Sequence, residues 1–187
     1  MSDQEYDSSN VGDTGVSQLY DRSMEEALIG AVLITPIVFL DVSTLLKAED
    51  FYYRSNQWIW TAFQSLYSSD PNFDLLTVKQ ELEAQGHLED VGGVEYLASL
   101  TNQVPSSLHA EAYARNINAL ATRRRLLASA NEIAKLAHRK DINLETVVDQ
   151  AEEAIFGVSQ DREKHDDRDR NGFDRVPEKN RDRRRDE

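Results

Sequence analysis

The chain has 187 residues, of which 40% are hydrophobic and 29% charged, and its formal net charge is -13. Because it contains no cysteine and no run of 18 apolar residues, the sequence excludes a disulfide framework, a thiolate metal site and a membrane-spanning helix. We expect a soluble cytoplasmic protein that makes no contact with a membrane.

The negative charge lies entirely in the first 160 residues. Residues 161–187 hold ten acidic and ten basic side chains, so the preceding part carries the whole net charge. Binding to nucleic acid depends on clustered lysine and arginine that neutralise phosphates. The acidic body of the chain therefore disfavours direct binding to nucleic acid.

The chain is predicted to begin with a disordered segment over residues 1–22, which is rich in serine, aspartate and glycine. The sequence Ser23-Met24-Glu25-Glu26 has the form of a capping box and predicts the start of a helix that ends near Thr35. Pro36 is expected to open a second, short helix, because proline is tolerated in a first turn.

Three more helices are predicted before residue 107. The third begins at a cap on Ser55 and carries a stripe of large apolar side chains, which places it at the centre of the core. Asp74 is the predicted N-cap of the fourth, and Gly86 its end. A fifth helix follows Gly92-Gly93 and ends before Pro105. Residues 23–106 are thus expected to form a globular helical head.

Residues 107–160 predict an antiparallel helical hairpin. The first arm, over about residues 108–139, contains no glycine or proline, and apolar residues recur along it at helical spacing. A turn at residues 140–143 leads to a second arm that ends near Gln160. The first arm is about twice as long as the second, so part of its apolar stripe needs cover from the head or from another chain. A second copy of this protein is one candidate.

After Gln160 the apolar pattern stops, and residues 161–187 are expected to form a charged, disordered tail. The predicted fold class is therefore all-α, with a globular helical head, a long antiparallel hairpin and disordered termini.

The sequence offers no set of residues for catalysis, for a cofactor or for a metal. A P-loop requires a lysine after its last glycine, and none of the eight glycines is followed by lysine. The four histidines lie too far apart for a zinc site of the HExxH type. We expect a protein without enzymatic activity.

Several motifs, in order, resemble the N-terminal domain of bacterial hexameric replicative helicases of the DnaB type. They are Asp50-Phe51-Tyr52, Asp74-Leu75-Leu76-Thr77-Val78, residues 86–97, Val104-Pro105-Ser106-Ser107, Tyr113-Ala114-Arg115 and residues 130–134. The resemblance implies a collar domain that pairs through its hairpin and receives the helicase-binding domain of primase. By motif, the primase-facing positions correspond to Tyr96, Leu127 and Ile133.

Three features depart from that family. The family usually begins its first helix after a Pro-Pro turn, where this chain has residues 19–22. The charged tail does not resemble the family's linker helix, which docks on a neighbouring motor, and the ATPase motor does not follow the hairpin. The resemblance predicts oligomerisation and primase docking in DNA replication without ATPase activity. The alternative is a free-standing adaptor or inhibitor that pairs with a complete, full-length replicative helicase.

A second reading applies to each candidate partner-binding residue. Arg123, Arg124 and Arg125 form the only basic cluster of the predicted folded part, which indicates a site for an acidic partner or a phosphate. Consecutive residues diverge around a helix, however, so the three arginines also fit an ordinary solvated surface. Tyr96, Leu127 and Ile133 likewise fit core positions.

Overall fold

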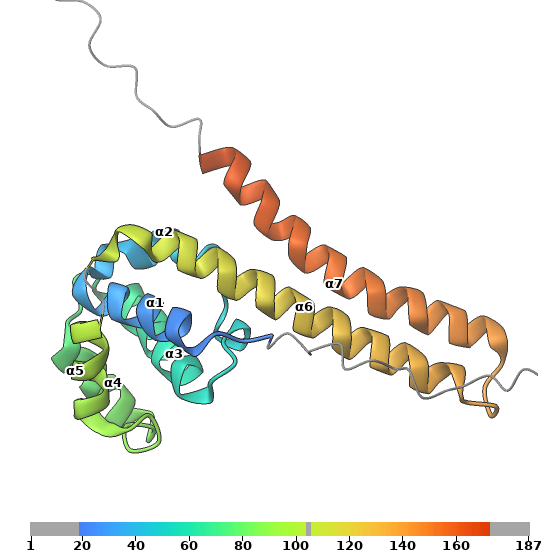
Figure 1. The fold of residues 1–187 in the computed structure, drawn as a ribbon, viewed down its shortest axis with the longest axis horizontal. Helices are drawn as coiled ribbons and strands as arrows, with labels where there is room; N and C mark the ends of the chain where they lie inside the picture. Colours follow the sequence, from blue (N-terminus) through green and yellow to red (C-terminus); the bar gives the residue numbers. More distant parts are fainter. Residues whose placement is uncertain (1–18, 104–105, 173–187) are drawn as a thin grey trace, which may run out of the picture.

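The computed structural model describes residues 19–103 and 106–172, and all of the regular structure in this part of the chain is helical (Figure 1). The head contains five α-helices and two short 3-10 helices, and a third 3-10 helix leads into the hairpin. In chain order the elements are α1 (Arg22–Ile34), η1 (Pro36–Val38), α2 (Phe39–Val42), η2 (Ala48–Asp50), α3 (Arg54–Ser69), α4 (Leu75–Ala84), α5 (Gly93–Gln103), η3 (Ser107–His109), α6 (Ala110–Ala137) and α7 (Leu144–Gly172). The all-α prediction is confirmed.

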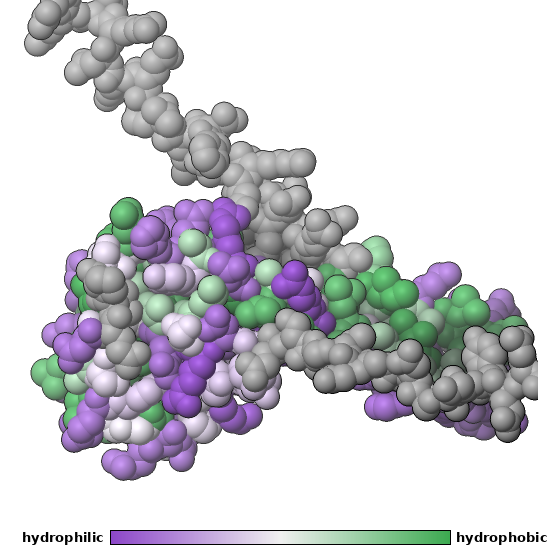
Figure 2. Space-filling view, viewed as in Figure 1, coloured by the Kyte–Doolittle hydropathy of each residue, from purple (hydrophilic) through white to green (hydrophobic). Residues whose placement is uncertain are grey.

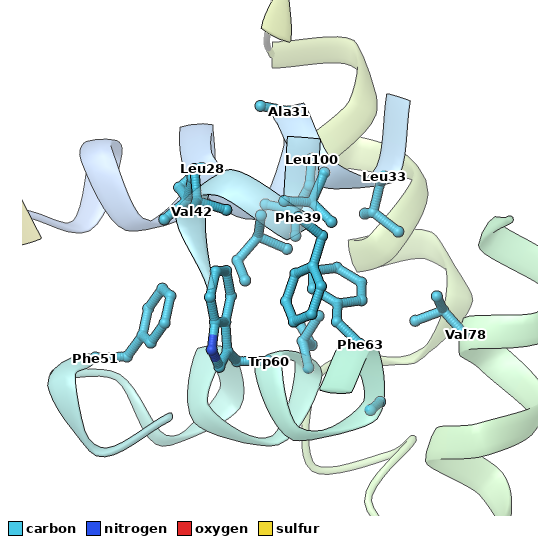
Figure 3. Packing of buried hydrophobic residues seen from close by; sticks show 14 of the residues in the cluster. Leu28, Ala31, Leu33, Phe39, Val42, Phe51, Trp60, Phe63, Val78 and Leu100 are labelled. Atoms are coloured by element: carbon cyan, nitrogen blue, oxygen red, sulfur yellow. The ribbon is translucent and has the colours of Figure 1, made fainter. Parts of the chain in front are cut away.

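The centre of the head is the aromatic layer between α1 and α3 (Figure 3). Trp60 and Phe63 of α3 are fully buried, and the ring of Phe39 lies 5.0 Å from that of Trp60 and 6.0 Å from that of Phe63. Phe51 closes the other side of Trp60 at 5.0 Å. Large aromatic rings bury much apolar area each, so this layer accounts for the predicted central position of α3.

The first helix begins two residues earlier than the sequence predicts. The carboxylate of Asp21 accepts a hydrogen bond from the Met24 amide at 3.1 Å, so Asp21 is the N-cap and the predicted capping box on Ser23 is wrong. The hydroxyl of Ser23 instead donates to Asp21. Since Asp21 and its neighbours from residue 19 belong to the folded head, the expected disorder of residues 19–22 is corrected.

The fourth and fifth helices are bounded as the local sequence predicts. Asp74 caps α4 by accepting from the Thr77 amide at 2.9 Å, and Gly86 ends it with φ of 76°. Gly92 and Gly93 also have positive φ, which only glycine adopts readily, and the first turn of α5 follows directly. These turns depend on neighbouring residues alone, which explains why the sequence specifies them.

The hairpin grows directly out of the head, because α6 belongs to both. Its first half is packed into the head through a buried stripe of small residues and one isoleucine, namely Ala110, Ala114, Ile117 and Ala121. Its second half leaves the head and lies antiparallel to α7 (Figure 1). The helices α1 and α6 pack against each other, and the small side chains of this stripe allow them to approach closely.

The second arm is longer than predicted. The helix α7 continues to Gly172, beyond the expected end at Gln160, and Figure 1 shows its last part diverging from α6. Residues 158–171 contain no glycine or proline, so nothing in the local sequence stops the helix there. The disorder expected for residues 1–18 and 173–187 lies outside the described residues. Within the described residues, no helix is both long and apolar enough to cross a membrane.

Candidate partner-binding site

The part of the hairpin beyond the head carries exposed apolar side chains on both arms. On α6, Leu126 is 51% exposed and Ile133 is half-buried. On α7, Leu144 is 76% exposed, Val148 48% and Ile155 54%. We call these five residues the apolar hairpin face.

Helical geometry places the five residues on one side of the hairpin. The two arms meet through Ser129 and Leu136 on α6 and through Ala154 and Val158 on α7, and the Ser129 hydroxyl donates to the Ala154 carbonyl at 3.1 Å. At 3.6 residues per turn, the exposed stripe of each helix lies about a quarter turn around the helix axis from the contact between the arms, and the sense of rotation is the same on both helices. Because the two helices run in opposite directions, equal rotations bring both stripes to the same side of the hairpin. The two stripes therefore lie next to each other.

Figure 2 shows apolar side chains gathered along the hairpin, whereas the head is largely polar in the same view. Contiguous apolar surface on a monomer marks a site for another protein or a ligand.

The apolar stripe predicted for the second arm of the hairpin is divided between two sides of α7. Its half-buried and buried members pack on α6, and the remainder faces outward. Those contacting or bordering α6 are Val147, Ala151, Ala154 and Val158.

Two arginines of α6 join the base of the hairpin to the head. Arg125 forms an ion pair with Asp50, whose side chain is only 2% exposed, and it also donates to the Thr122 hydroxyl at 3.1 Å. Arg124 donates to the backbone carbonyls of Asp50 and of Leu19, the latter at 2.7 Å. Burial lowers the pKa of Arg124, although nearby carboxylates oppose that shift.

A buried carboxylate from α1 completes this junction. Glu25 is 1% exposed and accepts hydrogen bonds from the amides of Tyr52 and Tyr53, at 2.7 and 3.3 Å, and from the side chain of Asn56 at 2.9 Å. Its negative charge therefore lies at the start of α3, where the helix dipole favours it. Burial raises the pKa of Glu25, while these hydrogen bonds and Arg124 act in the opposite direction.

The start of α3 corrects another sequence expectation. The N-cap of this helix is Tyr53 and not Ser55, and no side chain of the cap residue bonds the first turn. The carboxylate that serves this end of the helix comes from 28 positions earlier in the chain. No local pattern in the sequence signals such a contact, and the roles of Glu25 and Asp50 were missed for that reason.

The three consecutive arginines have different surroundings. Arg124 and Arg125 are half-buried and take part in the junction, whereas Arg123 is exposed. Arg124 also lies over the ring of Tyr52, 5.7 Å from its centre. The structure thus gives two of the three arginines contacts inside the chain, and only Arg123 is turned fully to solvent.

Tyr96 lies on the head, far along the chain from the hairpin candidates. It is half-buried against Gly92, and its hydroxyl donates to Glu26 at 3.1 Å. Glu26 also forms an ion pair with Arg22 at 2.8 Å. Burial, followed by the negative charge of Glu26, raises the pKa of Tyr96 to about 12.

The two hairpin candidates lie on different sides of α6. Ile133 belongs to the apolar hairpin face, while Leu127, which is 51% exposed, lies about half a turn away from the contact with α7. The structure therefore does not bring Tyr96, Leu127 and Ile133 together into one compact cluster. In the described part of the chain, no group of three histidine or acidic side chains is placed to hold a metal ion.

Comparison with known proteins gives a consistent result over most of the chain. Residues 17–119 match the family described as DnaB-like helicase N terminal domain. The replicative DNA helicase DnaB of Geobacillus stearothermophilus is 35% identical over 136 residues, and the replicative DNA helicase DnaC of Bacillus subtilis is 34% identical over the same length. Each match covers 73% of this chain and 30% of the relative, so the chain spans about a third of the relatives' length.

Solved structures agree in fold. The N-terminal domain of DnaB helicase from Mycobacterium tuberculosis superposes with a TM-score of 0.70 at 28% identity, covering 74% of this chain and 97% of that one. The corresponding domain from Helicobacter pylori, described together with its interactions with primase, gives a TM-score of 0.52 at 22% identity, covering 63% of this chain and 91% of that one. At that identity the second likeness bears on the fold alone.

Proposed function

The chain belongs to the DnaB-like helicase N-terminal domain family, and from this premise we propose that it acts by binding other proteins and carries no catalytic step of its own. It pairs with further copies through the apolar hairpin face and docks the helicase-binding domain of primase during DNA replication. The observation that carries the proposal is the exposed apolar stripe on both arms of the hairpin.

The shape of the hairpin supports self-association. Two antiparallel helices bury only the sides that face each other, and the apolar hairpin face adds a second, adjacent stripe on each arm. Packing against the same face of another copy removes both stripes from water at once, as in a four-helix bundle. Burial of apolar surface is the main favourable term in such an association.

Primase docking is supported by the family and by two kinds of surface on this chain. Relatives with the same fold have been described with their interactions with primase. In this chain the resemblance assigns Tyr96, Leu127 and Ile133 to that role, and the exposed Arg123 adds a positive charge one turn before Leu127. Because Ile133 lies on the apolar hairpin face, we place one part of the primase contact on Leu127 and Arg123 of α6 and a separate part on Tyr96 of the head.

Titration calorimetry with the helicase-binding domain of a primase tests the docking. We expect binding by the wild-type chain and a loss of at least tenfold in affinity for Leu127→Asp. The matched control is Leu76→Asp on α4, an equally exposed leucine at 57% against 51% for Leu127. Equal affinity of both variants contradicts the docking site. Binding to a complete replicative helicase but not to primase favours the adaptor or inhibitor instead.

A further inference from the structure

A row of side chains crosses the surface between Tyr96 in the head and the base of the hairpin. The hydroxyl of Tyr96 donates to Glu26 at 3.1 Å, and Glu26 pairs with Arg22 at 2.8 Å. The guanidinium of Arg22 in turn lies over the ring of Tyr53, 5.2 Å from its centre. Side chains of α5 and α1 thus lead directly from Tyr96 to the residue that precedes α3.

Three tyrosine rings carry the row on to α6. The ring of Tyr20 packs edge to face with that of Tyr53 at 5.9 Å, and it stacks on that of Tyr52 at 4.2 Å with an angle of 14° between the stacked planes. Arg124 of α6 lies over Tyr52, and Leu127 follows Arg124 by one helical turn. Each member of the row therefore contacts the next or lies one turn from it. We call Tyr20, Tyr52 and Tyr53 the tyrosine ridge.

The tyrosine ridge is accessible to a partner. Tyr52 is 48% exposed, and Tyr20 and Tyr53 are half-buried, so each ring keeps part of its surface in contact with water. The two arginines beside the rings are already occupied, because one pairs with a glutamate and the other donates to backbone carbonyls. Contact with a partner therefore has to come from ring faces and hydroxyls, which suit a protein surface and not a phosphate.

The rings are also held in place within the chain itself. Tyr20 is fixed by its stacking and by the neighbouring Leu19 carbonyl, which accepts from Arg124 at 2.7 Å. Tyr52 contacts both the Tyr20 ring and Arg124, and its amide donates to the buried Glu25 at 2.7 Å. Side chains that are already ordered lose little conformational entropy on binding, and tyrosine is among the residues that contribute most to protein interfaces.

We propose that the tyrosine ridge is a further contact surface for primase, which joins the separate contacts at Tyr96 and at Leu127 into one continuous docking site. This role rests on the proposed function, since its partner is the one proposed there. Continuity with both contacts favours that partner. The tyrosine ridge shares no residue with the apolar hairpin face, so a second copy paired through that face is not the expected occupant.

Fluorine NMR of the full chain labelled with meta-fluorotyrosine tests the tyrosine ridge directly. Each signal is assigned by the loss that a single tyrosine-to-phenylalanine substitution causes. Addition of the unlabelled helicase-binding domain of a primase is expected to shift or broaden the signals of Tyr20, Tyr52 and Tyr53. The control within the same chain is Tyr67 at the other end of α3, whose ring lies 5.3 Å from that of Phe39 and whose signal is expected to stay unchanged.

The affinity of single variants gives a second measurement. In titration calorimetry with the same primase domain, Tyr52→Ala should lose about fivefold or more in affinity at an unchanged helical spectrum, while the exposed Leu76→Ala on α4 should bind as the wild type does. Binding that leaves the three ridge signals unchanged, or equal affinity of the two variants, overturns the proposal and leaves docking at Leu127 intact. Ridge signals that instead move with the concentration of the chain alone assign the ridge to a second copy and also overturn it. If the wild type binds no primase, the proposed function fails, and this role of the tyrosine ridge fails with it.

Discussion

Replacing Asp50 by alanine tests whether the junction at the base of the hairpin stabilises the fold. The carboxylate of Asp50 has two tasks: it accepts from the Lys47 amide at 2.8 Å, and it pairs with Arg125. Asp50 is 1% exposed as a residue, so neither task can be taken over by water without rearrangement.

The expected loss of stability on replacing Asp50 follows from these two contacts. Loss of a capping side chain costs about 1 kcal/mol, and loss of a hydrogen bond to a charged group costs about 1.5–3 kcal/mol. The side chain of Arg125 keeps 29% of its exposure and regains some hydration, which places the second cost at the low end of its range. We therefore expect Asp50→Ala to lower the free energy of unfolding by about 2–3 kcal/mol.

Urea denaturation followed by circular dichroism measures the change in the free energy of unfolding. It is repeated at several protein concentrations, because the proposed self-association would stabilise the folded state by mass action. The control is Glu111→Ala, which breaks the ion pair with Arg115 on the exposed surface of α6, at 2.7 Å. An exposed pair contributes about 0–1 kcal/mol. If Asp50→Ala costs no more than Glu111→Ala, the junction does not stabilise the fold.

Three further predictions concern the head. The pKa of Tyr96 is raised from 10.0 to about 12, so the unfolded chain loses the phenol proton at a lower pH than the folded chain does. The free energy of unfolding of the wild type should therefore fall between pH 10 and about 12 relative to that of Tyr96→Phe. A difference between the two chains that stays constant over this range refutes the raised pKa. The pKa of Glu25 is raised from 4.5, so the wild type should lose stability relative to Glu25→Gln as the pH rises above about 4.5; a constant difference from pH 4 to 8 contradicts the shift. Gly92→Ala should lower the free energy of unfolding, measured by denaturant titration, by about 1–3 kcal/mol, because φ is 101° and the added Cβ would lie 3.0 Å from the Cβ of Tyr96. The control is Gly86→Ala, which should lower it less, because no atom lies within 4 Å of a Cβ added there.

The sequence predicts the elements whose causes are local. The cap on Asp74, the end of α4 at Gly86 and the long uninterrupted α6 all depend on residues within a few positions of one another. The apolar periodicity also identifies α3 as the central helix, because a stripe of large aromatic residues has to be buried. These features carry over from sequence to structure without any knowledge of the tertiary fold.

The features that were missed depend on contacts between distant segments. The start of α3 is served by Glu25, and residues 19–22 are ordered because Arg124, more than 100 positions later, holds the Leu19 carbonyl. The periodicity of α7 predicts an apolar stripe but cannot divide it between the side that packs on α6 and the side that stays exposed. That division, which defines the candidate site, requires the geometry of the hairpin.

Sedimentation velocity over a range of concentrations tests the central proposal, pairing through the apolar hairpin face, most directly. We expect the average mass of the wild-type chain to rise with concentration from that of one copy to that of two or more. Val148→Asp, an exposed substitution on α7, should hold the mass at one copy with an unchanged helical spectrum, while Leu76→Asp should behave as wild type. A wild-type chain that keeps the mass of one copy at every concentration contradicts the proposal.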